Sequence, residues 1–137
     1  MDDFLSPDSG LDQGLKFSIA AALSKQYSVD QRQFLASLAS MLEASFPQET
    51  EIEKRGGLFS RKEIRLVTVE LEGNRYGLED AGKGPLRASR THIVRGIALK
   101  TEEMPLPEWI TEVGAALEAQ MKTNAAARDA LAQWLSF

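Results

Sequence analysis

Three basic residues with chemistry suited to an anion occur close together in the middle of the chain. Arg87 and Arg95 carry guanidinium groups, which bind a carboxylate or a phosphate through two parallel hydrogen bonds, and His92 is the single histidine. If an uninterrupted strand aims Arg95 into the apolar side of a sheet, these residues predict a half-buried anion-binding site. An arginine aimed inward needs such a partner, because an unpaired buried charge costs several kcal/mol.

The glycine that follows Arg95 supports a second interpretation. Strict alternation would place Arg95 on the same face as Ile97 and Leu99. A β-bulge at Gly96 would reset the register, so that Val94 joins Ile97 and Leu99 on the inner face and Arg95 turns toward solvent. We expect the bulge, because it leaves no charge to be neutralised inside the protein.

Two other segments are candidates for contact with a partner. Apolar and basic residues occur together within LFSRK, residues 58–62, which suits an anionic partner, and the chain ends in an apolar group that is seldom left in water. We expect the partner to be a protein, and we expect a homodimer. The residues predicted to contact a partner are Leu58, Phe59, Arg61, Lys62, Trp134 and Leu135.

Catalytic and metal-binding patterns are scarce in the sequence. The chain has no cysteine and one histidine, and no HxxxH, HExxH or DxDxDG spacing occurs. Lys83 lies among glycines without the spacing of a phosphate-binding loop, and Glu102 and Glu103 are expected in a loop before a helix. We therefore expect no enzyme, no metal, no cofactor and no small-molecule substrate.

The charges are distributed unevenly along the chain. Residues 1–53 contain three basic and nine acidic side chains, residues 54–100 contain eleven and five, and residues 101–137 contain two and six. A basic sheet face built from residues 54–100 could follow phosphates, so an anion-binding or nucleic-acid-binding domain is the alternative function. The isoelectric point near 5.1 and the interleaved carboxylates favour cross-strand ion pairs instead.

Helical spacing of apolar residues dominates both ends of the chain. The pattern predicts a first helix over residues 11–25 and a second that opens with Ser28 and Gln31 in capping-box spacing and stops at Pro47. A third helix is predicted with Pro107 in its first turn, and the last stretch is also helical, with a break at Thr123 or Asn124. The apolar face of the third helix is expected to contain Trp109, Ile110, Val113, Leu117 and Met121.

Between the helices, apolar residues recur at every second position, which predicts strands. Val67, Val69 and Leu71 are expected on the inner face, and a short turn is expected at Gly73-Asn74. The segments are too close together for parallel crossovers, so we expect an antiparallel sheet. The four predicted strands cover residues 49–55, 62–73, 75–80 and 86–100.

The order ααββββαα defines an α+β protein with a four-stranded antiparallel sheet. A length of 137 residues suits one domain, and we expect residues 1–137 to form it, with residues 1–10 as a flexible tail. The acidic start of the chain lacks the basic residues of a signal peptide, and no uncharged apolar run reaches the length of a membrane span. We expect a soluble cytoplasmic protein.

The sequence also resembles a known group of proteins. The segments EIEKRGGLFSRKEIRLVTVELEGNRYGLE and RTHIVRGIALKTEEMPLPEW, with the C-terminal helix, resemble a small bacterial family of uncharacterised proteins that share a VRGI-L-K-EE-PL-EW core. The resemblance covers roughly residues 49–135 and implies a bacterial source. The chain also resembles, less closely, the small acidic chaperones of type III secretion, which are dimeric α+β proteins with a different order of strands and helices.

Overall fold

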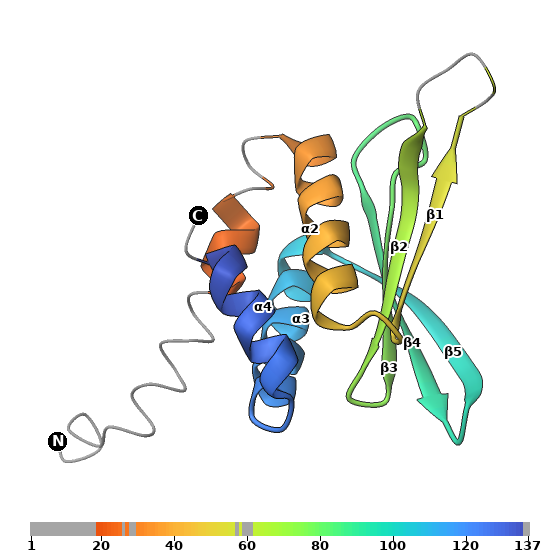
Figure 1. The fold of residues 1–137 in the computed structure, drawn as a ribbon. Coiled ribbons are helices and arrows are strands. Elements are labelled where there is room, and N and C mark those ends of the chain that lie inside the picture. Colours follow the sequence, from red (N-terminus) through yellow and green to blue (C-terminus); the bar gives the residue numbers. More distant parts are fainter. Residues whose placement is uncertain (1–18, 26, 28–29, 57, 59–61, 136–137) are drawn as a thin grey trace, which may run out of the picture.

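The alternating apolar residues in the middle of the chain form one antiparallel sheet (Figure 1). The computed structural model describes residues 19–25, 27, 30–56, 58 and 62–135. Each strand pairs with its neighbours in sequence, so the sheet order is β1-β2-β3-β4-β5, with β1 and β5 at the edges. The strands are β1 (Thr50–Arg55), β2 (Glu63–Leu71), β3 (Asn74–Glu79), β4 (Arg87–Val94) and β5 (Ile97–Met104).

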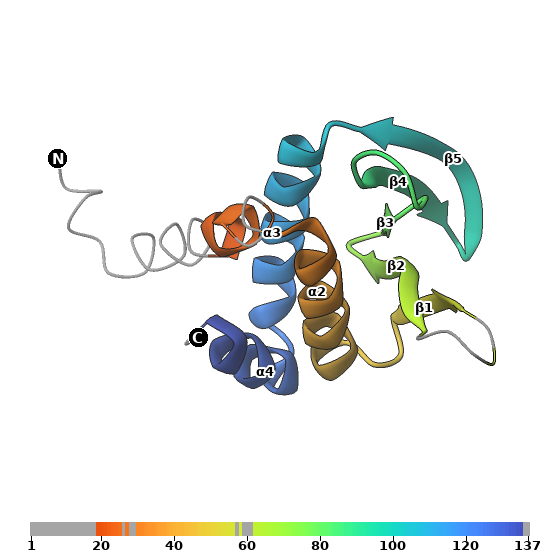
Figure 2. The ribbon, with the colours of Figure 1, turned by 90° about the horizontal axis from the view of Figure 1, so that it is seen from above.

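The helices lie together on one face of this sheet (Figures 1 and 2). They are α2 (Gln31–Ser45), α3 (Leu106–Met121) and α4 (Ala125–Leu135), and residues 19–25 are also helical. In both views α2 lies between the sheet and α4. Helices before and after one antiparallel sheet confirm the predicted α+β class. The part of the first predicted helix over residues 11–18, and the predicted tail over residues 1–10, lie outside the described residues.

The core forms where α2 and α3 meet the inner face of the sheet. Val67, Val69 and Leu71 of β2 are buried, as their alternation predicted. Trp109 of α3 is 1% exposed, and its ring contacts that of Tyr76 edge-on, with the ring centroids 6.5 Å apart. The other residues predicted on the apolar face of α3 are also buried: Ile110, Val113, Leu117 and Met121.

The ends of the helices follow local hydrogen-bonding rules. Asp30 caps α2, because its side-chain Oδ1 accepts hydrogen bonds from the backbone N–H groups of Arg32 (3.0 Å) and Gln33 (3.2 Å). Gln31 is therefore the first residue of the helix and not the third position of a capping box, and Ser28 lies outside the described residues. The predicted break before the last helix is confirmed, and the side chain of Asn124 accepts a hydrogen bond from the N–H of Ala127.

The prediction of four strands is wrong, because the segment 86–100 is not one strand. Arg95 and Gly96 have φ angles of 53° and 79° and form a two-residue turn between β4 and β5. Glu72 and Gly73 have the same angles between β2 and β3, so that turn lies one residue earlier than predicted. Two successive positive φ angles match the twist of the flanking strands, and glycine adopts the second at little cost.

The expected bulge at Gly96 is also wrong. Arg95 is exposed, as that interpretation required, but a turn places it in solvent. A register shift does occur nearby: His92 pairs with Lys100 and Ile93 pairs with Ala98, which leaves Leu99 as an extra residue in β5. The expectation that Val94, Ile97 and Leu99 point inward fails, because all three are exposed.

Candidate protein-interaction surface

Exposed apolar side chains gather at the turn between β4 and β5. Among the described residues, four large apolar side chains are exposed, and three of them are Val94 (40%), Ile97 (63%) and Leu99 (60%). We call residues 92–100 the hairpin tip. In Figure 1 the tip lies away from the helical layer, at the far edge of the sheet. Three neighbouring exposed apolar residues are more informative than scattered ones, because contiguous apolar surface is characteristic of interaction sites.

The hairpin tip also carries a rim of basic side chains. Arg95 occupies the turn, while His92 and Lys100 face each other across the two strands. His92 Nδ1 lies 3.2 Å from the side-chain oxygen of Asn74 on β3. Since β5 is an edge strand, the backbone groups on its outer side are available to another chain. The tip therefore combines apolar contact area, positive charge and an open strand edge.

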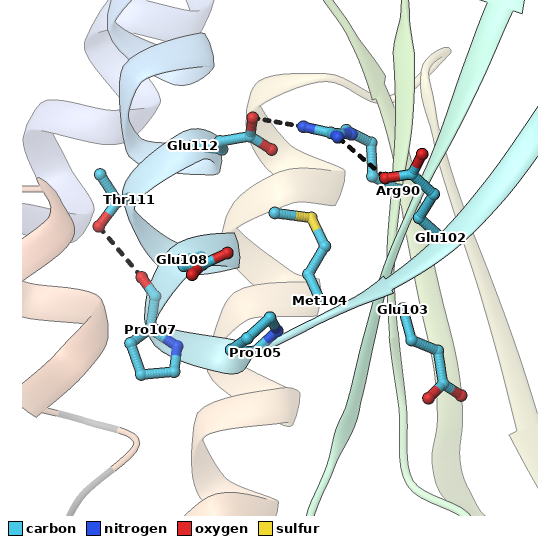
Figure 3. A pocket seen from close by; sticks show the side chains of 9 residues that line it. All are labelled: Arg90, Glu102, Glu103, Met104, Pro105, Pro107, Glu108, Thr111 and Glu112. Atoms are coloured by element: carbon cyan, nitrogen blue, oxygen red, sulfur yellow. Dashed lines mark hydrogen bonds and ion pairs between the residues drawn. The ribbon is translucent and has the colours of Figure 1, made fainter.

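A groove of opposite character lies at the other end of β5 (Figure 3). It has a volume of about 550 Å³ and is formed by the end of β5, the first turns of α3 and one residue of β4. Figure 3 shows Met104, Pro105 and Pro107 as its apolar part. We call it the acidic groove, because four of its lining residues are Glu102, Glu103, Glu108 and Glu112.

Arg90 organises the carboxylates of the acidic groove. Its guanidinium donates hydrogen bonds to Glu112 on α3 (2.5 Å) and to Glu102 on β5 (3.3 Å), as drawn in Figure 3. The hydrogen bond to Glu112 is the main cause that raises the pKa of Arg90. The pKa of Glu102 is lowered, chiefly by a hydrogen bond from Lys100 and also by the charge of Arg90. The lowered pKa favours the charged form of Glu102.

Glu108 differs from the other carboxylates of the groove. Glu103, by contrast, forms an ion pair with Arg87. Glu102 and Glu103 were expected in a loop, but β5 continues to Met104, so both belong to this strand. Glu108 lies in the first turn of α3 and is exposed, and it has no hydrogen-bonding or ionic partner in the described part of the chain. The carboxylate of Glu108 is therefore open to a cationic partner.

Most arginines of the sheet are engaged in ion pairs. Arg65 contacts Glu53 at 2.9 Å and Glu79 at 2.8 Å, one on each neighbouring strand. Arg75 contacts Glu70 on the adjacent strand at 2.8 Å. The predicted cross-strand pairing is thus confirmed. The arginines with a carboxylate partner are Arg55, Arg65, Arg75, Arg87 and Arg90.

The residues predicted to form an anion site are not brought together. Arg87 and Arg95 lie at opposite ends of β4, roughly 26 Å apart along an extended strand. His92 lies five residues after Arg87, so their side chains point to opposite faces of the sheet. Arg87 forms its ion pair with Glu103, and Arg95 belongs to the hairpin tip.

The residues predicted to contact a partner are only partly described. Leu58 is 97% exposed in the connection between β1 and β2, and Lys62 at the end of that connection is exposed as well. Phe59 and Arg61 lie outside the described residues. Trp134 and Leu135 belong to α4 by their backbone, but their side chains are outside the described set.

Sequence reasoning missed the apolar residues of the hairpin tip as candidate contacts. The signal that identifies them is the dipeptide Arg95-Gly96 between two alternating apolar runs, which is a two-residue hairpin pattern when the second residue is glycine. If the segment around Arg95-Gly96 is interpreted as a hairpin, Val94 and Ile97 lie directly opposite each other beside the turn. In the structure both residues are exposed.

The chain was compared with protein-family models, with curated proteins and with solved structures, and none matches. The resemblances to a bacterial family and to secretion chaperones therefore stay predictions. None of the described helices is long and apolar enough to cross a lipid bilayer. Within the described residues, no group of three or more histidine, cysteine, aspartate or glutamate side chains is placed to hold a metal ion.

Proposed function

We propose that this protein is a non-enzymatic interaction module, an adaptor or small chaperone-like protein, that binds a protein partner through its hairpin tip. The exposure of Val94, Ile97 and Leu99 beside an open strand edge carries the proposal. Solvation of this apolar cluster is unfavourable, and contact with another protein removes it from water. A protein partner can also pair with the backbone of β5, which gives affinity without a deep pocket.

The ion pairs of the sheet favour a protein partner over a nucleic acid. A phosphate that binds Arg65 or Arg75 must displace a carboxylate already within 2.9 Å. Each displacement forfeits an existing charge contact, so little of the usual electrostatic gain from phosphate binding remains. The cationic residues of the hairpin tip are few and surround an apolar centre, which suits a mixed apolar and acidic protein surface.

Site-specific photo-crosslinking tests the proposal. A benzophenone amino acid is placed at Ile97 in the hairpin tip and, as a matched control, at Ala44, an exposed apolar residue of α2. Irradiation in the native host is expected to give a discrete protein adduct from position 97 and none from position 44. Mass spectrometry of the adduct identifies the partner. Equal adduct patterns from both positions, or no adduct from position 97, would contradict the proposal.

A further inference from the structure

We infer that the partner of the hairpin tip is a second copy of this chain, joined by antiparallel pairing of the two β5 strands into one continuous sheet. The inference rests on the proposed function and names its partner. It follows from a relationship between two surfaces described above: the hairpin tip and the acidic groove lie at opposite ends of the same edge strand.

The two surfaces are complementary in charge and in apolar character. The tip presents Ile97 and Leu99 with Arg95 in the turn, and the groove presents Met104 and two prolines with the carboxylate of Glu108, which has no partner among the described residues. Antiparallel pairing of two copies of β5 brings the first end of one strand beside the last end of the other. Each hairpin tip then lies over the partner's acidic groove, and the same contact forms twice.

The two surfaces also open on the same face of the sheet. Leu99 and Arg90 line one shallow hollow beside His92, and Arg90 also lines the acidic groove. A two-fold axis perpendicular to the sheet relates antiparallel edge strands and keeps this face in common for both copies. The hairpin tip of one copy therefore lies on the same face of the joined sheet as the acidic groove of the other copy.

The charges along β5 define a register for the pairing. When the two strands are centred on Thr101, Lys100 of each copy lies opposite Glu102 of the other. Lys100 and Glu102 already form an ion pair within one chain at 3.3 Å, and with 75% and 44% of their side-chain surface exposed both can also reach the facing strand. Opposite charges on directly facing residues stabilise a pair of strands, and like charges destabilise it. In many proteins, however, charged residues on an edge strand prevent its pairing with another chain. Because the proposed register sets opposite charges against each other, reversing one charge tests whether the charges of β5 promote pairing or prevent it.

Charge reversal distinguishes a paired edge from a solvated one. In the proposed register, Lys100→Glu alone sets two carboxylates opposite each other at both contacts, and Glu102→Lys alone sets two ammonium groups together at both. Each variant is expected to have a dimer dissociation constant at least roughly tenfold above that of the unmodified chain. A mixture of the two variants restores both opposite-charge contacts, so a one-to-one heterodimer is expected. Sedimentation velocity measures the masses, and urea unfolding verifies that each variant is folded.

A second pair of variants tests the apolar contact. Ile97→Asp is expected to weaken the dimer by roughly a hundredfold, because it places a carboxylate in the acidic groove of the partner. Ala44→Asp introduces the same charge at an exposed apolar residue of α2, which packs against β1 and β2 at the opposite side of the sheet, and is expected to leave the dimer unchanged. Dimers that are equally weakened by both variants, or a mixture of charge variants that remains monomeric, would overturn the inference.

The failure of this inference is separable from the failure of the proposed function. An unmodified chain that is monomeric at about 100 µM, a concentration that populates even weak complexes, overturns the dimer. If position 97 nevertheless crosslinks a different protein, the interaction module stands with another partner. If the adduct joins position 97 to residues 1–18 of its own chain, the tip is covered internally and the dimer is again excluded. If the chain is monomeric and position 97 gives no adduct, both the interaction module and the β5-paired dimer are excluded.

Discussion

Trp109 donates a hydrogen bond from its indole Nε1–H to the backbone carbonyl oxygen of Ser89 at 3.1 Å, and this bond joins α3 to β4. Trp109 is almost completely buried, and its ring also contacts Tyr76 on β3. The helix that forms one wall of the acidic groove is therefore anchored to the strand next to β5. The groove depends on this anchor, because α3 supplies Glu108 and Glu112.

Two substitutions at Trp109 separate its hydrogen bond from its packing. Trp109→Phe keeps a buried ring but leaves the carbonyl of Ser89 without its donor, so a loss of about 1–3 kcal/mol in unfolding free energy is expected. Trp109→Ala also removes the ring and is expected to cost about 3–5 kcal/mol. Urea titration followed by circular dichroism measures both values. Equal losses for the two variants would show that the hydrogen bond, and not the ring, dominates.

The helices and the inner face of the sheet were predictable because burial imposes a period on the sequence. Trp109, Val113 and Leu117 recur at helical spacing, and Val67 and Val69 alternate, since one face of each element contacts the core. The number of strands was not predictable from burial, because Val94 and Ile97 are apolar but exposed. Their apolar character was interpreted as inner-face packing, and the turn between them was therefore interpreted as a bulge.

The candidate surface was even less accessible to sequence reasoning. The acidic groove joins Arg90 to Glu112, which are 22 residues apart, and only the packing of α3 against the sheet brings them together. Arg87, His92 and Arg95, from which an anion site was predicted, are not brought together, because successive residues of an extended strand point to opposite faces and lie far apart along it. Cross-strand ion pairs were predictable, since alternating opposite charges on adjacent strands satisfy one another without long-range packing.

The turn at Arg95-Gly96 predicts opposite effects for two neighbouring substitutions. Gly96→Ala is expected to destabilise the fold by about 1–2 kcal/mol, because its φ of 79° strains any residue with a Cβ. Apart from its chain neighbours Arg95 and Ile97, no described residue has an atom within 4 Å of the position of that Cβ, so the cost is conformational alone. Arg95→Asn is expected to stabilise the fold slightly, since asparagine tolerates a positive φ. Thermal unfolding checks both signs, and a neutral Gly96→Ala variant would contradict the assigned turn.

Gly77 lies in the interior of β3, where a steric contact decides the effect of alanine. A Cβ at this position would lie 2.8 Å from Oγ of Ser89, which is closer than real Cβ contacts. Gly77→Ala is therefore expected to destabilise the fold by about 1–3 kcal/mol. Ser89→Ala removes the clashing oxygen, so adding Gly77→Ala in that background is expected to be neutral or stabilising, because alanine lowers the entropy of the unfolded chain. A double-mutant cycle with no coupling would refute the steric explanation.

Tyr76 makes stability depend on pH in the alkaline range. Burial is the main cause that raises the pKa of Tyr76 above its usual value of 10.0, and the charge of Glu112 adds to it. A group with a raised pKa in the folded chain contributes stability that is fully present below the unfolded pKa and is lost as pH rises through the folded one. Unfolding free energy is therefore expected to fall above about pH 10 more steeply than in Tyr76→Phe. Urea titrations at several pH values measure the two slopes, and identical slopes would exclude the titration of Tyr76 as the cause.

Binding to nucleic acid decides between the proposed function and the alternative of a basic, anion-binding sheet. We expect no retention on single-stranded or double-stranded DNA at about 50 mM salt, where phosphate contacts are strong. The physical reason is that Arg65 and Arg75 already contact carboxylates at 2.8–2.9 Å, so a phosphate gains little by replacing them. Fluorescence anisotropy with labelled oligonucleotides measures the affinity. The matched variant combines Glu53→Gln, Glu79→Gln and Glu70→Gln, which removes the carboxylate partners of Arg65 and Arg75. Binding by the unmodified chain that weakens steeply with salt would establish the alternative, whereas binding that appears only in the variant would show that ion pairing is what keeps phosphates away.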